Sequence, residues 1–317
     1  MARTTVVVNQ PENKKKKINH RKYIVLYLMM IPGLLYLLIN SYLPMFGIFI
    51  AFKKVNFARG IFNSDWIGFS NFEYLFKTSD AFIITRNTIL YNLLFIVLGL
   101  ALALLTAILL NEIKNKLLLR SYQAIITLPH LISMVIVSYL VYGFLSVETG
   151  LLNNTILPWL GVKEIFWYSE DKYWPFILTL TNLWKSVGYS SIVFFAAVVG
   201  IDEEYYEAAR LDGASRWKQI IHITIPILTP VIIMLTLLNI GRIFYSDFGL
   251  FYQVPMNSGA LFSTTATIDT YVFNGLMGSG DIGMSTAAGV YQSIVGFLLV
   301  LLSNYIVRKK DKENALF

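Results

Sequence analysis

The sequence predicts an all-α, polytopic membrane protein with six transmembrane helices. Of its 317 residues, 56% are hydrophobic and only 14% are charged, whereas soluble domains carry about 25% charged residues. Six segments reach the roughly 20 mostly apolar residues that a spanning helix needs. They are 23–51, 87–111, 121–146, 174–200, 221–244 and 286–307. We therefore expect a transmembrane domain over 23–307 between two tails, 1–22 and 308–317.

The N-terminal tail is polar and basic, with the run Lys14, Lys15, Lys16 and Lys17. It is too long before the apolar segment, and lacks the small-residue cleavage site after it, to be a signal peptide. We expect a retained, solvated tail. In the spans that follow, Pro32, Pro44, Pro129, Pro226 and Pro230 lie inside or at the ends of the apolar segments, where they kink or end helices.

The distribution of Lys and Arg predicts the orientation in the membrane. Basic residues near span ends stay in the cytoplasm, and they concentrate in both tails and in the loops that follow 87–111 and 174–200. The outer loop between 244 and 286 has none. Both termini are therefore expected in the cytoplasm of a cell-membrane protein, and so is the loop 201–220.

Several function classes are disfavoured by what the sequence lacks. No Asp or Glu falls in the interior of a predicted span, although a proton-coupled carrier usually needs an intramembrane carboxylate. The sequence has no G-x-x-x-x-G-K-[ST] loop for ATP, no Cys and only three His. We expect no catalytic residue, no metal site and no cofactor bound by this chain, so nucleotide energy must come from a partner.

Two basic residues fall within predicted spans, Lys185 in the fourth and Arg242 in the fifth. A cation at mid-membrane costs at least about 2.5 kcal/mol, so each should face protein or a wet cavity. Rings and amides lie nearby at helical spacing, and such groups suit a polyhydroxylated cargo. The candidate cargo wall comprises Asn182, Trp184, Lys185, Tyr189, Asn239, Arg242, Tyr245 and Ser246. The alternative is that the two cations snorkel or bond one helix to another.

The loop 201–220 predicts two short helices joined by a sharp bend. Asp202, Glu203 and Glu204 place negative charge at a helix start, and Gly213 suits the left-handed residue that closes a helix. Helical character resumes at Ala214 and leads into the fifth span at Pro226. A push on this elbow would tilt that span.

The same residues carry a family resemblance. Glu207, Ala208, Ala209, three residues, Gly213, nine residues and then ITIP at Ile223 resemble the E-A-A-x3-G-x9-I-x-L-P signature of permease subunits in binding-protein-dependent ATP-binding-cassette (ABC) importers. Ile225 replaces the signature Leu. The resemblance implies a type I importer permease fold whose elbow is the cytoplasmic coupling (EAA) helix. Its docking residues toward the ATPase would be Glu207, Ala208, Ala209, Asp212 and Gly213.

Other segments resemble the polysaccharide or complex-carbohydrate (LplB-like) branch of that family. They are PMFGIFIAFKKVNF from Pro44, WIGFSNFEYLF from Trp66, LLNEIKNK from Leu109, LPHLIS from Leu128, LWKSVGYSSI from Leu183 and IDTYVF from Ile268. The branch implies carbohydrate cargo, a second and heterologous permease, an extracytoplasmic sugar-binding protein, and two ATPase subunits that hold ATP and Mg. It implies alternating access driven by nucleotide.

Three alternatives stay open at this point. The chain could be a permease for another polar solute, or a sodium-coupled secondary carrier that uses backbone carbonyls. It could also be a membrane enzyme such as a glycan transferase, although Glu203 and Glu204 fit helix-start charges better than a catalytic acid pair. Co-purification of an ATPase would favour the importer over the secondary carrier.

Overall fold

The computed structural model describes residues 23–310. The chain divides into two units, 1–48 and 49–317, which are considered separately. The predicted tail 1–22 lies outside the described residues, as does most of the predicted tail 308–317. Nearly all the described residues that are in regular structure are helical, as expected.

The first unit contains most of the first apolar segment. Helix α1 (Ile24–Leu37) continues through a π-helical turn, η2 (Leu38–Tyr42), and then a 3-10 helix, η3 (Leu43–Phe52), which extends into the second unit. Pro32 lies inside α1 without ending it. With 29 residues and a mean hydropathy of 2.0, Ile24–Phe52 is long and apolar enough to cross a membrane.

The second unit opens with a small ribbon that leads into a long helix. Strands β1 (Lys53–Lys54) and β2 (Asp65–Trp66) pair antiparallel, with Lys53 opposite Trp66. The amphipathic helix α2 (Ser70–Lys77) follows, and Asn71 on it donates to the carbonyls of Ala51 and Lys53 at 2.7 and 3.0 Å. The span helix α3 (Ser79–Asn111) begins eight residues before the apolar segment predicted from the sequence.

The third predicted span is not one helix. Instead α4 (Lys116–Leu131) and α5 (Met134–Leu145) meet at a 95° bend. The predicted segment 121–146 is therefore two helices, which meet near Pro129, one of the prolines expected to kink or end a helix. Pro129 weakens the last turn of α4, and Ser133 starts a new helix by accepting a hydrogen bond from the Ile136 N–H.

A loop connects α5 to α7 (Trp174–Val199) through the short elements η4 (Leu152–Ile156), α6 (Leu157–Trp159) and η5 (Asp171–Tyr173). Asn153 is buried in this loop, and its side-chain amide bonds both the N–H and the carbonyl of Ile165 at 3.0 Å. Helix α7 coincides with the predicted segment 174–200 to within one residue, with Pro175 in its first turn and Gly200 at its end.

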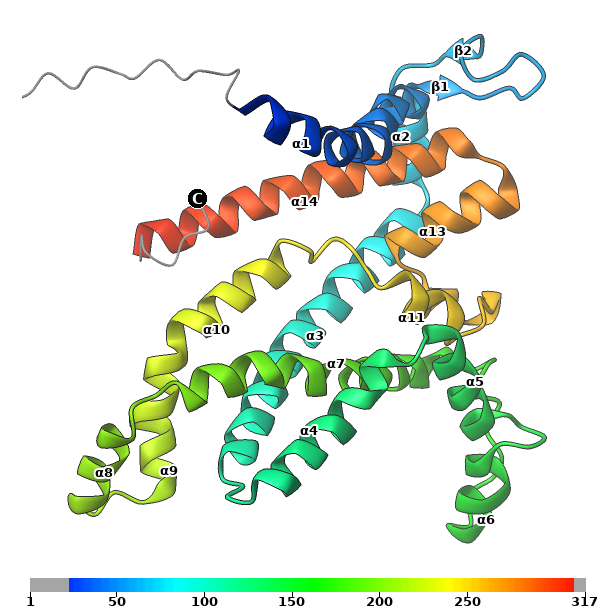
Figure 1. Ribbon diagram of the computed structural model, residues 1–317. Coiled ribbons are helices and arrows are strands. Elements are labelled where there is room, and N and C mark those ends of the chain that lie inside the picture. The colour runs from blue at the N-terminus through cyan, green and yellow to red at the C-terminus, as the bar shows by residue number, and fades with distance from the viewer. Residues whose placement is uncertain (1–22, 311–317) are drawn as a thin grey trace, which may run out of the picture. The chain divides into compact units, whose positions relative to one another are not determined.

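Two short helices precede the next span, as predicted. They are α8 (Glu203–Leu211) and α9 (Arg216–Gln219), and a π-helical turn, η6 (Ile220–Thr224), joins α9 to α10 (Ile225–Ile240). The pair lies beyond the C-terminal end of α7 (Figure 1). Helix α10 ends at Ile240, four residues before the predicted boundary, and a turn occupies Gly241–Phe244.

The last part of the chain folds back as short helices before one long helix. The short elements are α11 (Phe248–Gln253), η7 (Gly259–Leu261), α12 (Phe262–Thr265), α13 (Ile268–Asn274) and η8 (Gly275–Ser279). Helix α14 (Ile282–Lys310) then contacts α2, α10 and α13.

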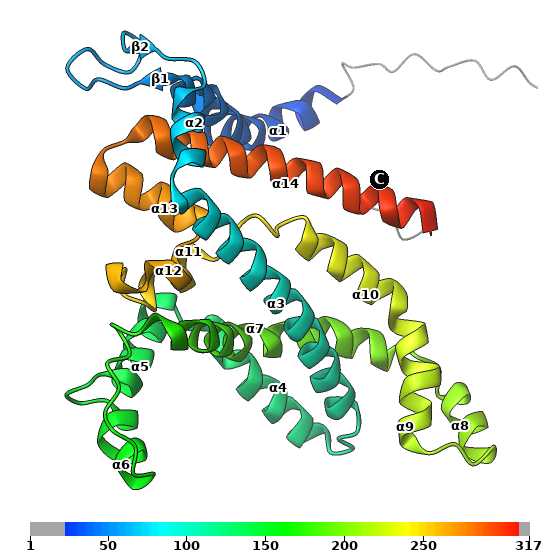
Figure 2. The same ribbon diagram turned by 180° about the vertical axis from the view of Figure 1, so that it is seen from behind.

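The centre of the second unit is the crossing of α3 and α7, which is visible from both sides (Figures 1 and 2). Ala103 and Ala107 of α3 are fully buried against Phe194 of α7, because small side chains let two membrane helices approach closely. Helix α4 packs on α7 as well. This arrangement connects the elbow, which follows α7, to the bend between α4 and α5.

Candidate functional site

The elbow begins with a well-capped helix. The Asp202 carboxylate accepts a hydrogen bond from the Glu204 N–H at 3.1 Å, and Glu203 and Glu204 lie in the first turn of α8. These negative charges complement the positive end of the helix dipole. Arg210 in the last turn pairs with Glu203 at 2.9 Å. Short as it is, α8 therefore has favourable charges at both ends.

Gly213 makes the bend that the sequence predicts. It has a φ of +76°, a conformation that is costly for residues with a Cβ. Its N–H donates to the Arg210 carbonyl at 3.1 Å, and the Ala214 N–H donates to the Ala209 carbonyl at 2.8 Å. Ser215 then caps α9 by accepting from the Lys218 N–H. The prediction of two helices closed by a left-handed glycine is confirmed.

The elbow presents an exposed surface that mixes apolar and acidic side chains. Leu211 is 90% exposed and Trp217 is 67% exposed. Glu207 and Ala208 are also exposed, whereas Ala209 is half-buried. These two large apolar side chains lie beside the predicted docking residues. Four of the five predicted docking residues are exposed, since Asp212 and Gly213 are exposed too.

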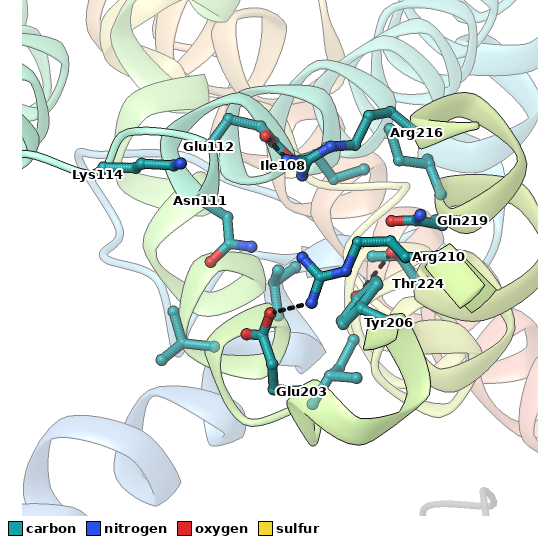
Figure 3. A pocket seen from close by; sticks show the side chains of 14 residues that line it. Ile108, Asn111, Glu112, Lys114, Glu203, Tyr206, Arg210, Arg216, Gln219 and Thr224 are labelled. Carbon is teal, nitrogen blue, oxygen red and sulfur yellow. Dashed lines mark hydrogen bonds and ion pairs between the residues drawn. The ribbon is translucent and has the colours of Figure 1, made fainter. Parts of the chain in front are cut away.

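Behind the elbow lies a polar cavity of about 460 Å³, enclosed between α8, α9 and the C-terminal ends of α3 and α7 (Figure 3). Arg216 of α9 reaches Glu112, the residue after α3, with nitrogen–oxygen distances of 2.9 and 3.0 Å. Tyr206 of α8 bonds the Thr224 hydroxyl at 2.9 Å. The elbow is thus attached to two spans, through α3 and through the turn η6.

The predicted cargo wall on α7 divides into exposed and engaged residues. Trp184 and Tyr189 are exposed, and the Tyr189 ring stacks on His130 with 4.2 Å between ring centroids. Asn182 and Lys185 are half-buried. The Lys185 ammonium donates to the carbonyls of Pro129, His130 and Ile132 at the end of α4. This contact is the helix-to-helix alternative foreseen for Lys185.

The second half of the predicted wall does not form one helical face. Asn239 is on α10 and donates to the Leu235 carbonyl at 2.8 Å, but Arg242 lies in the turn after α10, and Tyr245 and Ser246 follow it without helical structure. The expectation that all four share one face is wrong, because Gly241 ends the helix before the apolar segment ends. Arg242 and Tyr245 are nevertheless exposed, whereas Ser246 is half-buried.

A carboxylate that the sequence analysis placed in an outer loop holds this region together. Asp269, at the start of α13, accepts hydrogen bonds from the Ser246 N–H and hydroxyl, both at 2.7 Å, and from the Gln292 amide at 3.1 Å. The buried Gln292 side chain, on α14, also donates to the Phe244 carbonyl at 2.6 Å. The pairing was missed because its partners lie 23 residues away on either side.

Residues 23–310 contain no group of three or more His, Asp or Glu placed to hold a metal ion.

Comparison with known proteins gives consistent matches over nearly the whole chain. Residues 96–312 match the family model described as "Binding-protein-dependent transport system inner membrane component". Protein LplB of Bacillus subtilis (strain 168) is 38% identical over 289 residues, covering 91% of this chain and 90% of that protein. The polygalacturonan/rhamnogalacturonan transport system permease protein YteP of the same strain is 35% identical, covering 97% and 95%.

Solved structures give the same result. A chain of a bacterial ABC transporter involved in the import of the acidic polysaccharide alginate matches with a TM-score of 0.83 and 32% identity, covering 91% of this chain and 96% of that chain. The bacterial alginate ABC transporter in complex with an alginate pentasaccharide-bound periplasmic protein matches with a TM-score of 0.82 and 32% identity, covering 92% and 96%.

Proposed function

This chain belongs to the family of binding-protein-dependent transport system inner membrane components, and from that premise we propose that it is one of two membrane subunits of an ATP-driven carbohydrate importer. The observation that carries the proposal is the 38% and 35% identity to LplB and YteP, together with the 32% identity to the alginate importer chain. The cargo class is an oligosaccharide or complex glycan. This chain provides half of the translocation pathway.

We propose that the elbow α8–α9 is where the ATPase acts on this subunit. The docking residues are Glu207, Ala208, Ala209, Asp212 and Gly213. Support comes from the exposed apolar side chains beside them and from the attachment of the elbow to two spans. ATP and Mg belong to the partner ATPase, which hydrolyses the nucleotide. Movement of the elbow then reaches α10 through the continuous turn η6.

The cargo path follows the half of the predicted wall that is accessible. Trp184 and Tyr189 offer exposed rings that can stack on sugar faces, and the exposed Arg242 and Tyr245 offer a cation and a further ring. Asn239 on α10 is exposed as well, whereas Asn182 and Ser246 are half-buried and lie behind these side chains. Lys185 affects the cargo path indirectly, by holding the end of α4 through the backbone carbonyls that it binds.

The assembly has four further members. A second, heterologous permease completes the pathway, two ATPase subunits bind below the elbows, and an extracytoplasmic sugar-binding protein delivers the cargo to the outer loops. Both termini and the elbow face the cytoplasm. The chain has no Cys, so a single cysteine introduced at Ser215 or at Ser169 gives a unique label for each side of the membrane.

The test of the proposed function is uptake by the complete complex in proteoliposomes. The complex combines this chain with the second permease, the binding protein and the ATPase, and the cargo is first identified as the oligosaccharide that the binding protein retains. ATP-dependent uptake of that sugar is the expected result. Uptake that needs a sodium gradient and no ATPase would overturn the proposal, and so would labelling of Ser215→Cys from the outside of intact cells.

A further inference from the structure

Two separate sequence segments meet at the bend between α4 and α5. One is 128–133, which contains Pro129, His130 and Ile132, and the other is 183–192 on α7. The Lys185 Nζ lies 3.2 Å from the Pro129 carbonyl oxygen and 3.1 Å from that of His130, and it also bonds the Ile132 carbonyl. One ammonium group therefore uses its three donors on three backbone carbonyls of another helix.

These carbonyls lie at the end of α4 and in the residue after it, where the regular hydrogen bonds of the helix stop. The last four carbonyls of an α-helix lack their i+4 N–H partner, and at this 95° bend the Pro129 carbonyl accepts a backbone hydrogen bond from the Ile132 N–H at 3.3 Å. Without water in the hydrocarbon, each unpaired group is costly. A cation at this place also faces the negative end of the α4 dipole. No ion pair among residues 23–310 includes Lys185, so the carbonyls provide its electrostatic partner.

The neighbours of Lys185 on α7 bring the two helices close enough for this contact. Gly188 lies one turn further along, and a Cβ placed there would lie 1.8 Å from the Ile126 carbonyl oxygen of α4. Only glycine permits so close an approach. Tyr189 then stacks on His130 with 8° between the ring planes. The lysine, the glycine and the tyrosine together fix α7 to the end of α4.

The far side of the bend is fixed as well. A Cβ on Gly249 of α11 would lie 3.0 Å from the Met134 Cβ at the start of α5. Helix α11 follows the segment that carries the exposed side chains of Arg242 and Tyr245, and α7 leads to the elbow through Gly200. The bend therefore lies beside the proposed cargo path and contacts the helix that leads to the elbow.

We propose that Lys185 is a positioning residue of transport: it locks the bend to α7, so that α4 and α7 move as one body when the elbow moves. The proposal rests on the proposed function, in which force enters at the elbow. Lys185 acts on the cargo path through the α4 carbonyls rather than by touching the sugar.

The first measurement is the kinetics of ATP-driven uptake by the complete complex with Lys185→Met. The expected result is a loss of kcat of at least about tenfold with KM unchanged within about twofold, while basal ATP hydrolysis persists. Lys185→Arg keeps a cation with several donors and should restore most of kcat. Gly188→Ala leaves the lysine in place but pushes α4 away, so it should reproduce the loss of kcat. Lys77→Met, at an exposed ion pair on α2, is the matched control.

A cargo contact would give a different pattern. An increase in KM with kcat preserved in Lys185→Met would overturn the proposal, as would wild-type kinetics in either Lys185→Met or Gly188→Ala. If wild-type complex itself imports no carbohydrate, the proposed function fails, and the role of Lys185 is then decided by a measurement that needs no transport.

That measurement is the distance distribution between spin labels on α4 and α7. Because the chain has no Cys, Tyr122→Cys and Val193→Cys provide the only labelling sites, and both positions are exposed. Lys185→Met should broaden the distance distribution. Lys185→Arg and Lys77→Met should give the same distribution as the labelled chain that keeps both lysines. An unchanged distribution in Lys185→Met would overturn the proposal whatever the cargo is.

Discussion

Replacement of Gly213 tests whether the bend in the elbow must be left-handed. The residue has a φ of +76°, and a Cβ there would find no heavy atom within 4 Å. Alanine would therefore meet no clash, and its cost is only the positive φ, about 1–2 kcal/mol. Asparagine tolerates this region better. Proline requires a φ near −65°, a rotation of roughly 140°, and it also removes the N–H that bonds the Arg210 carbonyl at 3.1 Å.

The expected order of ATP-driven uptake is therefore wild type, Gly213→Asn, Gly213→Ala and last Gly213→Pro. A cost of 1–2 kcal/mol reduces the population of the native bend by about 5- to 30-fold relative to alternatives, so alanine should reduce coupling and proline should abolish it. The assay is uptake by the complete complex, with the amount of co-purified ATPase and of membrane-inserted chain measured in parallel. Wild-type uptake by Gly213→Pro at wild-type levels of inserted chain would refute the reasoning.

Three further predictions concern other parts of the site. Glu207→Lys should abolish co-purification of the ATPase. It should not unfold the chain, because the 4.0 Å ion pair between Glu207 and Arg210 is exposed and such pairs contribute under about 1 kcal/mol. Glu204→Lys on the same helix is the control, and equal ATPase binding by both variants would count against Glu207 as a docking residue. Asp269→Asn should lower the melting temperature of the detergent-solubilised chain by several degrees, since hydrogen bonds to a charged group contribute about 1.5–3 kcal/mol each. Asp65→Asn, at an exposed carboxylate, is the control and should leave the melting temperature unchanged. An unchanged melting temperature in Asp269→Asn would contradict the stabilising role of its hydrogen bonds to Ser246 and Gln292. Arg242→Met should raise the KM for uptake of an acidic sugar about tenfold or more with little change in kcat, and an unchanged KM would remove Arg242 from the cargo path.

The sequence predicts those elements whose ends carry chemical signals. The apolar segment 174–200 predicts α7 to within one residue, and the helix has Pro175 in its first turn and Gly200 at its end. Asp202 and Gly213 predict the start and the bend of the elbow because capping and left-handed conformations depend on the local residue type. Local rules were sufficient wherever the structure is itself local.

The sequence fails as a guide where contacts between distant segments decide the structure. Hydropathy is continuous over 121–146, so it could not reveal a 95° bend, although Pro129 followed by Ser133 is a signal for a helix end and a new start. Hydropathy also extended the predicted fifth span to Phe244, whereas α10 ends at Ile240, before Gly241. Asp269 appeared to be a loop residue because no local pattern shows that Ser246 and Gln292 converge on it.

The π-helical turn at Ile220–Thr224 joins the elbow to α10. A π turn holds one more residue than an α turn, whereas each residue of a regular α-helix advances the chain by about 100° around its axis. Removing one residue from η6 would therefore convert it to a regular α turn and leave α8 and α9 close to their present direction. The same deletion a turn further along, in the regular part of α10, would swing the elbow around the helix axis by about 100°, so η6 is a place where the elbow and the span tolerate a change in chain length.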